Sequence, residues 1–150
     1  TGAYNRRYYE DRIRKVKSHA GVAMIDLDDF KLYNDTCGHN AGDMVLNTVV
    51  GIVRKCIRKT DILIRYGGDE FLLILPDVSE DEIRQRLAKM RADYKLFGKQ
   101  KKQTAFTFSC GVEKYTDSMD VSDVYRQADE KLYQAKERGR DCVIFEAIRS

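Results

Sequence analysis

Two carboxylates directly follow a pair of glycines in the segment Arg65-Tyr66-Gly67-Gly68-Asp69-Glu70-Phe71. The apolar runs on either side, Ile62-Leu63-Ile64 and Phe71-Leu72-Leu73-Ile74-Leu75, predict two strands of a hairpin that meet across the glycines. Glycine adopts positive φ readily and lets another molecule approach the backbone. A turn accounts for Gly67 and Gly68 but not for the acids, so Asp69 and Glu70 are candidates for chemistry. Solvated turn residues are the alternative interpretation.

A second acidic segment, Asp26-Leu27-Asp28-Asp29, follows an apolar run that predicts a buried strand. Phe30 then begins a short predicted helix. Carboxylates at the carboxyl end of a strand, followed by the free N–H groups of a helix N-terminus, are typical of a site for a metal ion and a phosphate.

If this strand and the hairpin are neighbours in a sheet, Asp26 and Asp69 converge on one divalent cation. Oxygen ligands without a thiol or a histidine pair favour Mg²⁺ over zinc, and Mg²⁺ is usually bound by one or two carboxylates together with substrate phosphates. The implied substrate is a nucleoside triphosphate. Because alternate residues of a strand face opposite sides, Asp69 and Glu70 cannot both reach one cation from an extended backbone, and Asp69 is the firmer ligand.

Lys136 and Arg140 lie four residues apart at the end of a predicted helix, where they can reach phosphate oxygens together. The alternative is structural, because cations near a helix C-terminus complement the helix dipole. His39 is interpreted as a hydrogen-bonding residue of a turn-rich loop rather than as a catalyst.

The remaining pattern predicts the elements that position these residues. The predicted helices cover a charged segment up to about Ser18, residues Asp43 to Arg58, a segment N-capped by Ser79 that reaches Phe97, and a segment that starts between Asp120 and Asp123 and ends before Gly139. The other strands are Gly21 to Ile25, Ala105 to Val112 and Asp141 to Phe145, with a polar connection from Gly98 to Gln103. This order predicts an α/β (α+β) fold with a mixed central sheet of about five strands, flanked by helices and related to the split βαβ pattern.

Composition limits the possible functions of the chain. Its 150 residues suit a single domain, and 27 basic against 24 acidic residues leave a net charge of only +3. This balance argues against a polymer of nucleic acid as a partner. The four cysteines are far apart and without zinc spacing, which suits free thiols in a reducing cytosol. No transmembrane run or signal peptide is found, so we expect no membrane contact and a cytoplasmic location, alone or as the cytosolic part of a membrane-anchored protein.

Taken together, these residues resemble the GGDEF family, the diguanylate cyclases that join two GTP molecules into cyclic di-GMP. The resemblance covers essentially all of residues 1–150. It depends on four motifs in the family's order: Thr1 to Arg7, Asp26 to Asp43, Gly67 to Phe71, and Ala135 to Arg140. It implies a palm-like, ferredoxin-like cyclase domain, and the abrupt start of the sequence suggests a fragment of a longer protein with a sensory domain on its N-terminal side.

The resemblance also implies a role for individual residues. Asp26, the Leu27 carbonyl and Asp69 would bind Mg²⁺, with Mn²⁺ as a substitute, and Glu70 would be an additional catalytic carboxylate. Asn34 and Asp43 would read the guanine edge. The triphosphate contacts would fall on the backbone around Asp29 and Phe30 and on the side chains of Lys31, Lys136 and Arg140. Two subunits, each holding one GTP, would face each other as a homodimer.

The segment Arg58-Lys59-Thr60-Asp61 matches the family's RxxD inhibitory motif at its usual distance before the glycines. The resemblance therefore implies that Arg58 and Asp61 bind the product, with a solvated helix end as the alternative. Asp69 stands where many members have glutamate, and Asp29 is an extra acid near the phosphate loop.

Two other functions stay open at this point. One is a catalytically silent domain that binds GTP or cyclic di-GMP and regulates a partner. The other is a different nucleotidyl transfer on a palm-like scaffold, although the absence of a broad basic stripe argues against a template-dependent polymerase.

Overall fold

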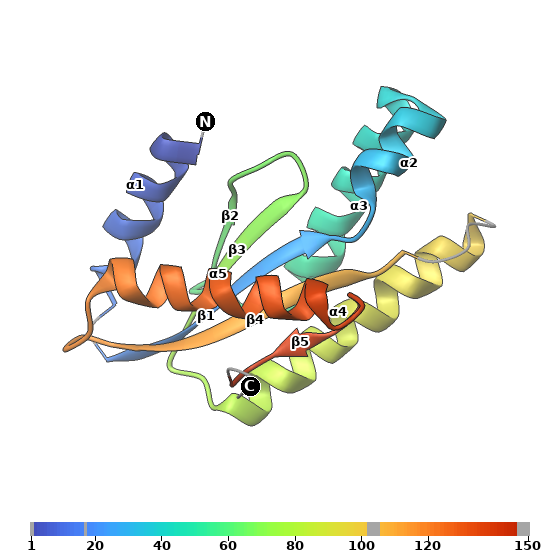
Figure 1. Ribbon diagram of the computed structural model, residues 1–150. Helices are drawn as coiled ribbons and strands as arrows, with labels where there is room; N and C mark the ends of the chain where they lie inside the picture. Colours follow the sequence, from blue (N-terminus) through green and yellow to red (C-terminus); the bar gives the residue numbers. More distant parts are fainter. Residues whose placement is uncertain (1, 17, 102–105, 147–150) are drawn as a thin grey trace.

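The computed structural model describes residues 2–16, 18–101 and 106–146. Its elements follow the predicted order (Figure 1). They are α1 (Gly2–Ile13), β1 (His19–Leu27), α2 (Phe30–Cys37), α3 (His39–Cys56), β2 (Ile62–Arg65), β3 (Glu70–Pro76), α4 (Glu80–Gln100), β4 (Phe108–Thr116), α5 (Val121–Glu137) and β5 (Val143–Ile144).

One sheet with the strand order β2-β3-β1-β4-β5 forms the centre of the described residues. Three strand pairs, β2–β3, β3–β1 and β1–β4, are antiparallel, whereas β4 and β5 are parallel. The predicted mixed sheet is therefore confirmed. Because β1 lies at the centre, its end meets the β2–β3 hairpin on one side and β4 on the other.

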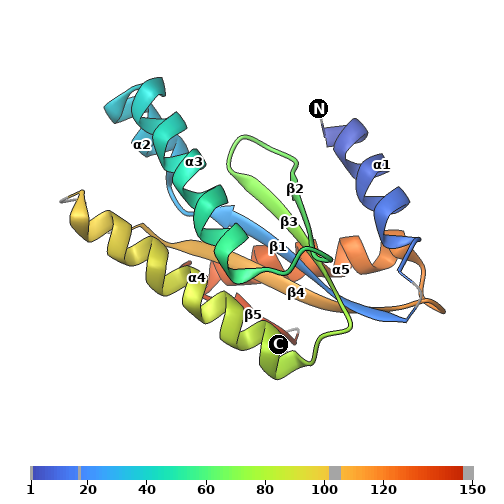
Figure 2. The same ribbon diagram turned by 180° about the vertical axis from the view of Figure 1, so that it is seen from behind.

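Alternation along β1 divides the core into two layers, one on each face of the sheet. Ala23, Ile25 and Leu27 pack with α3 and α4. Val22 and Met24 point to the opposite face, where they pack with α5 and α1. Figure 1 shows α5 crossing the front of the sheet, and Figure 2 shows α3 and α4 covering the back.

Local sequence signals explain where the long helices begin and how closely they pack. Ser79 accepts a hydrogen bond from the Glu82 N–H at 3.2 Å, so the predicted N-cap is present, and Asp120, at the predicted start of α5, accepts one from the Ser122 N–H at 2.8 Å. Gly111 on β4 allows close approach of α5, because a Cβ there would overlap the backbone of Ala128 and Leu132. This contact fixes α5, and with it the end that carries Lys136.

The loop between β2 and β3 differs from the predicted Gly-Gly turn. Four residues, Tyr66 to Asp69, separate the strands, and neither Gly67 nor Gly68 has a positive φ. Arg65 closes this loop by donating side-chain hydrogen bonds to the carbonyls of Gly67 (3.3 Å) and Gly68 (3.0 Å). Positive φ was therefore the wrong reason for the glycines, and close packing at Gly67, described below, replaces it.

Several predicted boundaries were also wrong. The second helix extends to Cys37, and the third begins at His39 rather than near Asp43, so most of the turn-rich loop expected from Asn34 to Gly42 is helical. The α4 helix continues through Gly98 to Gln100, into the predicted connection. The next strand begins at Phe108, while the predicted start at Ala105 lies outside the described residues, and the last strand is only two residues long. Propensity does not mark such ends well, because packing extends or shortens an element by several residues.

Candidate active site

A cavity of about 240 Å³ lies where the end of β1, the start of α2, the β2–β3 loop and the end of α5 meet. The end of β1 and the start of α2 are consecutive, whereas the β2–β3 loop and the end of α5 are distant in the sequence and come to the site through the central position of β1. The cavity is lined by Asp26, Leu27, Asp28, Asp29, Phe30, Lys31, Leu32, Asp69, Lys136 and Arg140.

Asp26 and Asp69 line this cavity together, as the sequence predicted. The antiparallel register of β1 and β3 places Asp26 opposite Glu70, and the Leu27 N–H donates to the Asp69 carbonyl at 3.1 Å. Both carboxylates therefore lie at one edge of the sheet although 43 positions separate them in the chain.

Asp26 occupies an electrostatically unfavourable position. Its residue is only 7% exposed, and burial raises the pKa of its carboxyl group to about 6. The Lys136 ammonium contacts the Asp26 carboxylate and lowers this pKa, whereas the neighbouring Asp69 charge raises it again. A second positive charge at this point would stabilise both carboxylates.

Lys136, at the end of α5, is surrounded by the same carboxylates. Burial acts to lower the pKa of its ammonium, but the contact with Asp26 outweighs burial, and the pKa is raised. The lysine is therefore a bound cation held beside two carboxylates.

Glu70 lies beside this pair without lining the cavity. It begins β3, whereas Asp69 belongs to the preceding loop, so the two side chains take different directions. Burial, followed by the charge of Asp26, raises the pKa of Glu70. A Cβ at Gly67 would lie 3.1 Å from the Glu70 carboxylate, which shows that glycine at this position makes room for Glu70.

Asp28 has a structural part in the site that the sequence did not reveal. Its carboxylate accepts hydrogen bonds from the hydroxyls of Thr107 (2.8 Å) and Ser109 (2.6 Å) and from the Asp141 N–H (3.0 Å). These bonds tie the end of β1 to β4 and to the segment after α5. Because these bonds use its lone pairs, Asp28 has a structural role and fixes the positions of the segments around the site.

The segment after α5 is fixed by a second set of ionic contacts. The Asp141 carboxylate pairs with Arg91 at 2.8 Å and with Lys95 at 2.9 Å, both from α4. Arg140 and Asp141 have positive φ values of 68° and 51°. The anchored Asp141 therefore holds the strained turn that directs Arg140 to the cavity.

The start of α2 contributes backbone groups to the cavity. Asp29 precedes the helix with φ 56°, and its side chain makes no capping hydrogen bond. Phe30 and Lys31, the first residues of the helix, line the cavity with it. An uncapped helix N-terminus presents N–H donors, which suit an anionic ligand.

Asn34 and Asp43 lie beyond this cavity, at the junction of α2 and α3. The Asn34 amide is 3.1 Å from His39 Nδ1, and Gly42 leaves room for the Asn34 side chain. Asn34 is half-buried and Asp43 is exposed. His39 does form a hydrogen bond, as expected, but from the start of a helix and not from a loop.

Arg58 and Asp61 form a separate cluster at the end of α3. The side chain of Asp61 is fully buried and accepts hydrogen bonds from the Arg58 N–H (2.7 Å), the Arg58 guanidinium (2.9 Å) and Arg86 of α4 (2.9 Å). Sequence reasoning missed Arg86, which lies 25 positions away. A pocket of about 290 Å³ includes Arg54, Arg58 and Asp61 in its lining.

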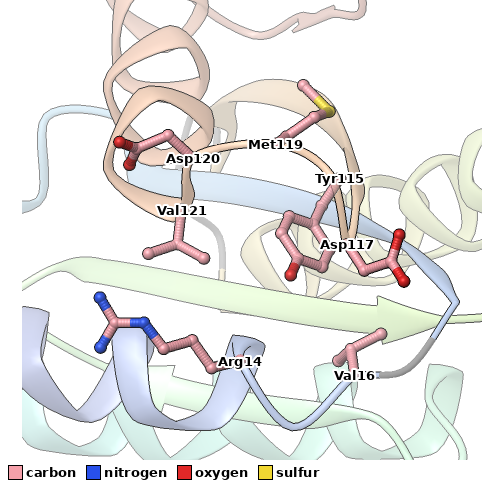
Figure 3. Close-up of a pocket in the computed structure, with 7 residues that line it drawn as sticks. All are labelled: Arg14, Val16, Tyr115, Asp117, Met119, Asp120 and Val121. Carbon is pink, nitrogen blue, oxygen red and sulfur yellow. The ribbon is translucent and has the colours of Figure 1, made fainter.

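A larger cavity, about 460 Å³, lies elsewhere (Figure 3). The figure shows Arg14 and Val16 on one side and the turn carrying Asp117, Met119 and Asp120 on the other. Since Thr116 pairs with His19 at the start of β1, this cavity is at the opposite end of the sheet from Asp26. It shares no residue with the acidic site.

The chemistry of the donors at the acidic site fits a divalent cation. Two carboxylates of like charge, one of them buried with a raised pKa, stand beside a single lysine. Across the described ranges, His, Cys, Asp and Glu form no cluster of three that could hold a metal. A set of two carboxylates and a backbone carbonyl is the kind that Mg²⁺ uses with substrate oxygens.

Comparison with known proteins identifies the family. The profile of "Diguanylate cyclase, GGDEF domain" matches residues 1–142. The chain belongs to the GGDEF domain family. The probable diguanylate cyclase DgcT of Escherichia coli is 34% identical over 96% of this chain, but the chain spans only 34% of the length of DgcT.

Solved GGDEF domains have the same fold. The domain of DgcB from Caulobacter crescentus in complex with c-di-GMP matches 95% of this chain and 88% of its own with a TM-score of 0.82, at 24% identity. The active GGEEF domain of a diguanylate cyclase from Vibrio cholerae matches 97% and 95% with a TM-score of 0.79, at 26% identity. The predicted cyclase architecture is therefore confirmed. In the parts of this GGDEF domain that are described, no helix is both long and apolar enough to cross a membrane.

Proposed function

We propose that this GGDEF domain is a diguanylate cyclase that condenses two GTP molecules into cyclic di-GMP and releases two pyrophosphates. The observation that carries the proposal is the meeting of Asp26 and Asp69 in one cavity with Lys136 and Arg140. Paired carboxylates beside two cations suit the triphosphate of a nucleotide and its metal ion. Membership of the family supports the choice of GTP.

The residues that would hold Mg²⁺, or Mn²⁺ in its place, are Asp26, Asp69 and the carbonyl of Leu27. When bound, the ion would neutralise phosphate charge and align the attacking and leaving oxygens. Asp26 must be ionised to accept it. The Lys136 ammonium, which contacts this carboxylate, provides a positive charge next to it before the ligand binds.

The cations and N–H groups around the cavity would hold the triphosphate. The start of α2, with Phe30 and Lys31, offers backbone donors, and Arg140 supplies a guanidinium on a fixed turn. Lys136 would exchange Asp26 for a phosphate oxygen. Asn34 and Asp43, at the α2–α3 junction, would then bind guanine through hydrogen bonds.

The reaction needs two such sites. In each of two steps, the ribose 3′-oxygen of one GTP attacks the α-phosphorus of the other. The new P–O bond forms as the bond to the β-phosphate breaks, and pyrophosphate leaves. The 3′-hydroxyl proton must be accepted, and Glu70 is a candidate because its raised pKa makes it a stronger base than an exposed carboxylate. We therefore propose a homodimer with one GTP in each subunit.

Product binding at the separate cluster is a second part of the proposal. Asp61 is already bonded to Arg58 and Arg86, so its role would be to hold Arg58 in place for the product. The complex of the DgcB domain with c-di-GMP supports cyclic di-GMP as the ligand class. An N-terminal sensory domain and a location in the cytoplasm stay predictions.

The test is direct. The protein at high concentration is incubated with GTP and Mg²⁺, and cyclic di-GMP and pyrophosphate are quantified. We expect both products, with a rate per subunit that rises with protein concentration because two subunits must meet. Binding of GTP without turnover would instead identify a silent binding domain.

A further inference from the structure

Three tyrosines connect the first helix to the catalytic loop. Tyr9 lies on α1, Tyr125 on α5, and Tyr66 directly after β2. The ring centroids of Tyr9 and Tyr125 are 5.3 Å apart, and those of Tyr125 and Tyr66 are 5.8 Å apart with an interplanar angle of 82°. These are favourable tilted and edge-to-face contacts between aromatic rings.

The hydroxyl groups of the last two tyrosines form a directed chain. Tyr125 donates a hydrogen bond to the Tyr66 hydroxyl. Tyr66 is also paired with Glu70 across the hairpin through its backbone N–H, and hydrogen bonding by the Tyr66 hydroxyl acts to lower the pKa of the Glu70 carboxyl group. Each hydroxyl donates one proton and accepts another, so the chain ends at an acceptor, the carboxylate.

The backbone keeps Tyr66 and Glu70 in register. The Tyr66 N–H donates to the Glu70 carbonyl at 3.0 Å, which closes the loop that contains Gly67, Gly68 and Asp69. Gly67 leaves space for the Glu70 carboxylate but offers no side chain to orient it. The Tyr66 hydroxyl is a neighbour that can orient this carboxylate, together with the charge of Lys136.

Tyr9 supplies a rigid support for this chain. It is only 1% exposed, and its hydroxyl donates to the Val121 carbonyl at 2.8 Å. A buried hydroxyl is costly without a partner, so this bond fixes the Tyr9 ring against Tyr125. Tyr125 is thereby limited in its choice of rotamer.

We propose that Tyr66 and Tyr125 are positioning residues that hold the Glu70 carboxylate in one orientation for the cyclase reaction. The inference rests on the proposed function, because the role of Glu70 does. It adds two residues, one of them on α5, to those that set the rate. It also makes the packing of α1 on α5 part of the support of the catalytic loop.

The experiment compares Tyr66→Phe, Tyr125→Phe and the double variant with the wild type at saturating Mg²⁺. Loss of a hydrogen bond to a charged group should lower kcat about tenfold in Tyr66→Phe, with KM for GTP changed less than about twofold. Because Tyr125 acts on Glu70 only through Tyr66, the effects of the two substitutions on kcat should be non-additive, and the double variant should be no slower than Tyr66→Phe. Phenylalanine keeps both rings in contact.

Two control variants separate positioning from stability. Tyr133→Phe removes a hydroxyl from the exposed side of the same helix, where the residue is 64% exposed, and should behave as wild type. Tyr9→Phe removes the bond to Val121 but keeps the ring against Tyr125, so it should lower the melting temperature and reduce kcat less than Tyr66→Phe does. Wild-type kcat in Tyr66→Phe and Tyr125→Phe would overturn the proposal. Loss of kcat only in proportion to melting temperature, with Tyr9→Phe equally slow, would overturn it too.

A second measurement does not need turnover. The ¹³C resonance of the Glu70 carboxyl carbon, assigned by its loss in Glu70→Gln, should shift in Tyr66→Phe and in Tyr125→Phe but not in Tyr133→Phe. An unchanged resonance would contradict the positioning role. Wild-type protein that makes no cyclic di-GMP would overturn the proposed function, and this resonance would still decide whether the tyrosines hold the carboxylate.

Discussion

Two buried aspartates, Asp61 in the loop between α3 and β2 and Asp26 near the end of β1, have very different surroundings. Asp61 is surrounded by donors, with two arginines and a backbone N–H on its carboxylate. Asp26 is about equally buried, yet it faces a second carboxylate, Asp69, and shares a single lysine with it. The protein satisfies the first group by itself, whereas the second is the one that we propose a cation completes.

This difference separates a structural carboxylate from one that is prepared for a ligand. A buried charge is tolerated when it is paired and hydrogen-bonded, as Asp61 is. Asp26 instead has a raised pKa, the usual sign of a site where stability is given up for function. Removal of the Asp61 charge should therefore lower the stability of the fold and change activity little. Removal of a charge from the Asp26–Asp69 pair should lower activity and change stability little.

The largest effect is expected from Asp69→Asn. Loss of one of the two carboxylates should reduce cyclic di-GMP formation by roughly 100-fold or more, since metal ligands and the residues around them have effects of this size. The melting temperature should stay within a few degrees of wild type, because a repulsion with Asp26 is removed. Turnover assays and thermal melts on the same preparation test this, and retained activity would refute the metal role of Asp69.

Asp61→Asn should give the reverse result. Two arginines would lose their anionic partner, and we expect the free energy of unfolding to fall by about 2 kcal/mol. The initial rate of the folded fraction should change little, because Asp61 is not in the acidic cavity. Urea denaturation measures the first quantity. A variant as stable as wild type would show that the cluster does not support the fold.

Arg58→Ala should weaken the binding of cyclic di-GMP about tenfold, which corresponds to one lost charged contact. Titration calorimetry with the product measures this affinity. Arg54→Ala, a neighbour in the same pocket, is a matched control that removes a cation without touching Asp61. Unchanged affinity in Arg58→Ala would leave the RxxD match as a coincidence.

A smaller effect is expected from pH. The pKa of Asp26 is about 6 in the folded protein against 3.8 for an ordinary aspartate, so the folded state binds more protons between these values. The contribution of Asp26 to stability therefore falls as the pH rises from about 4 to about 6, by on the order of 1 kcal/mol. Mg²⁺ should restore this stability above pH 6 and bind more weakly below it.

Melting temperatures from pH 4.5 to 8, with and without Mg²⁺, test this prediction. Asp26→Asn is the control, because its melting temperature should lack both the fall and the response to Mg²⁺. A wild-type curve that matches that of Asp26→Asn would contradict the unfavourable environment assigned to Asp26.

The sequence predicted the parts of this structure that depend on local pattern and on short motifs. The element order followed from apolar periodicity, and the meeting of Asp26 with Asp69 followed from placing the first strand beside the hairpin. Asp28 and Arg86 were missed, because their roles depend on partners 25 to 113 positions away. The tyrosine chain was missed for the same reason, since no local pattern links residues 9, 66 and 125.

The central claim is that Asp26 and Asp69 hold a divalent cation against a guanosine triphosphate. The most direct measurement is anomalous diffraction from crystals grown with Mn²⁺ and a non-hydrolysable GTP analogue. We predict a manganese peak between the two carboxylates, in contact with the Leu27 carbonyl and with phosphate oxygens held by Lys136 and Arg140. A nucleotide bound elsewhere, or bound in the cavity with no metal beside these two carboxylates, would contradict the account.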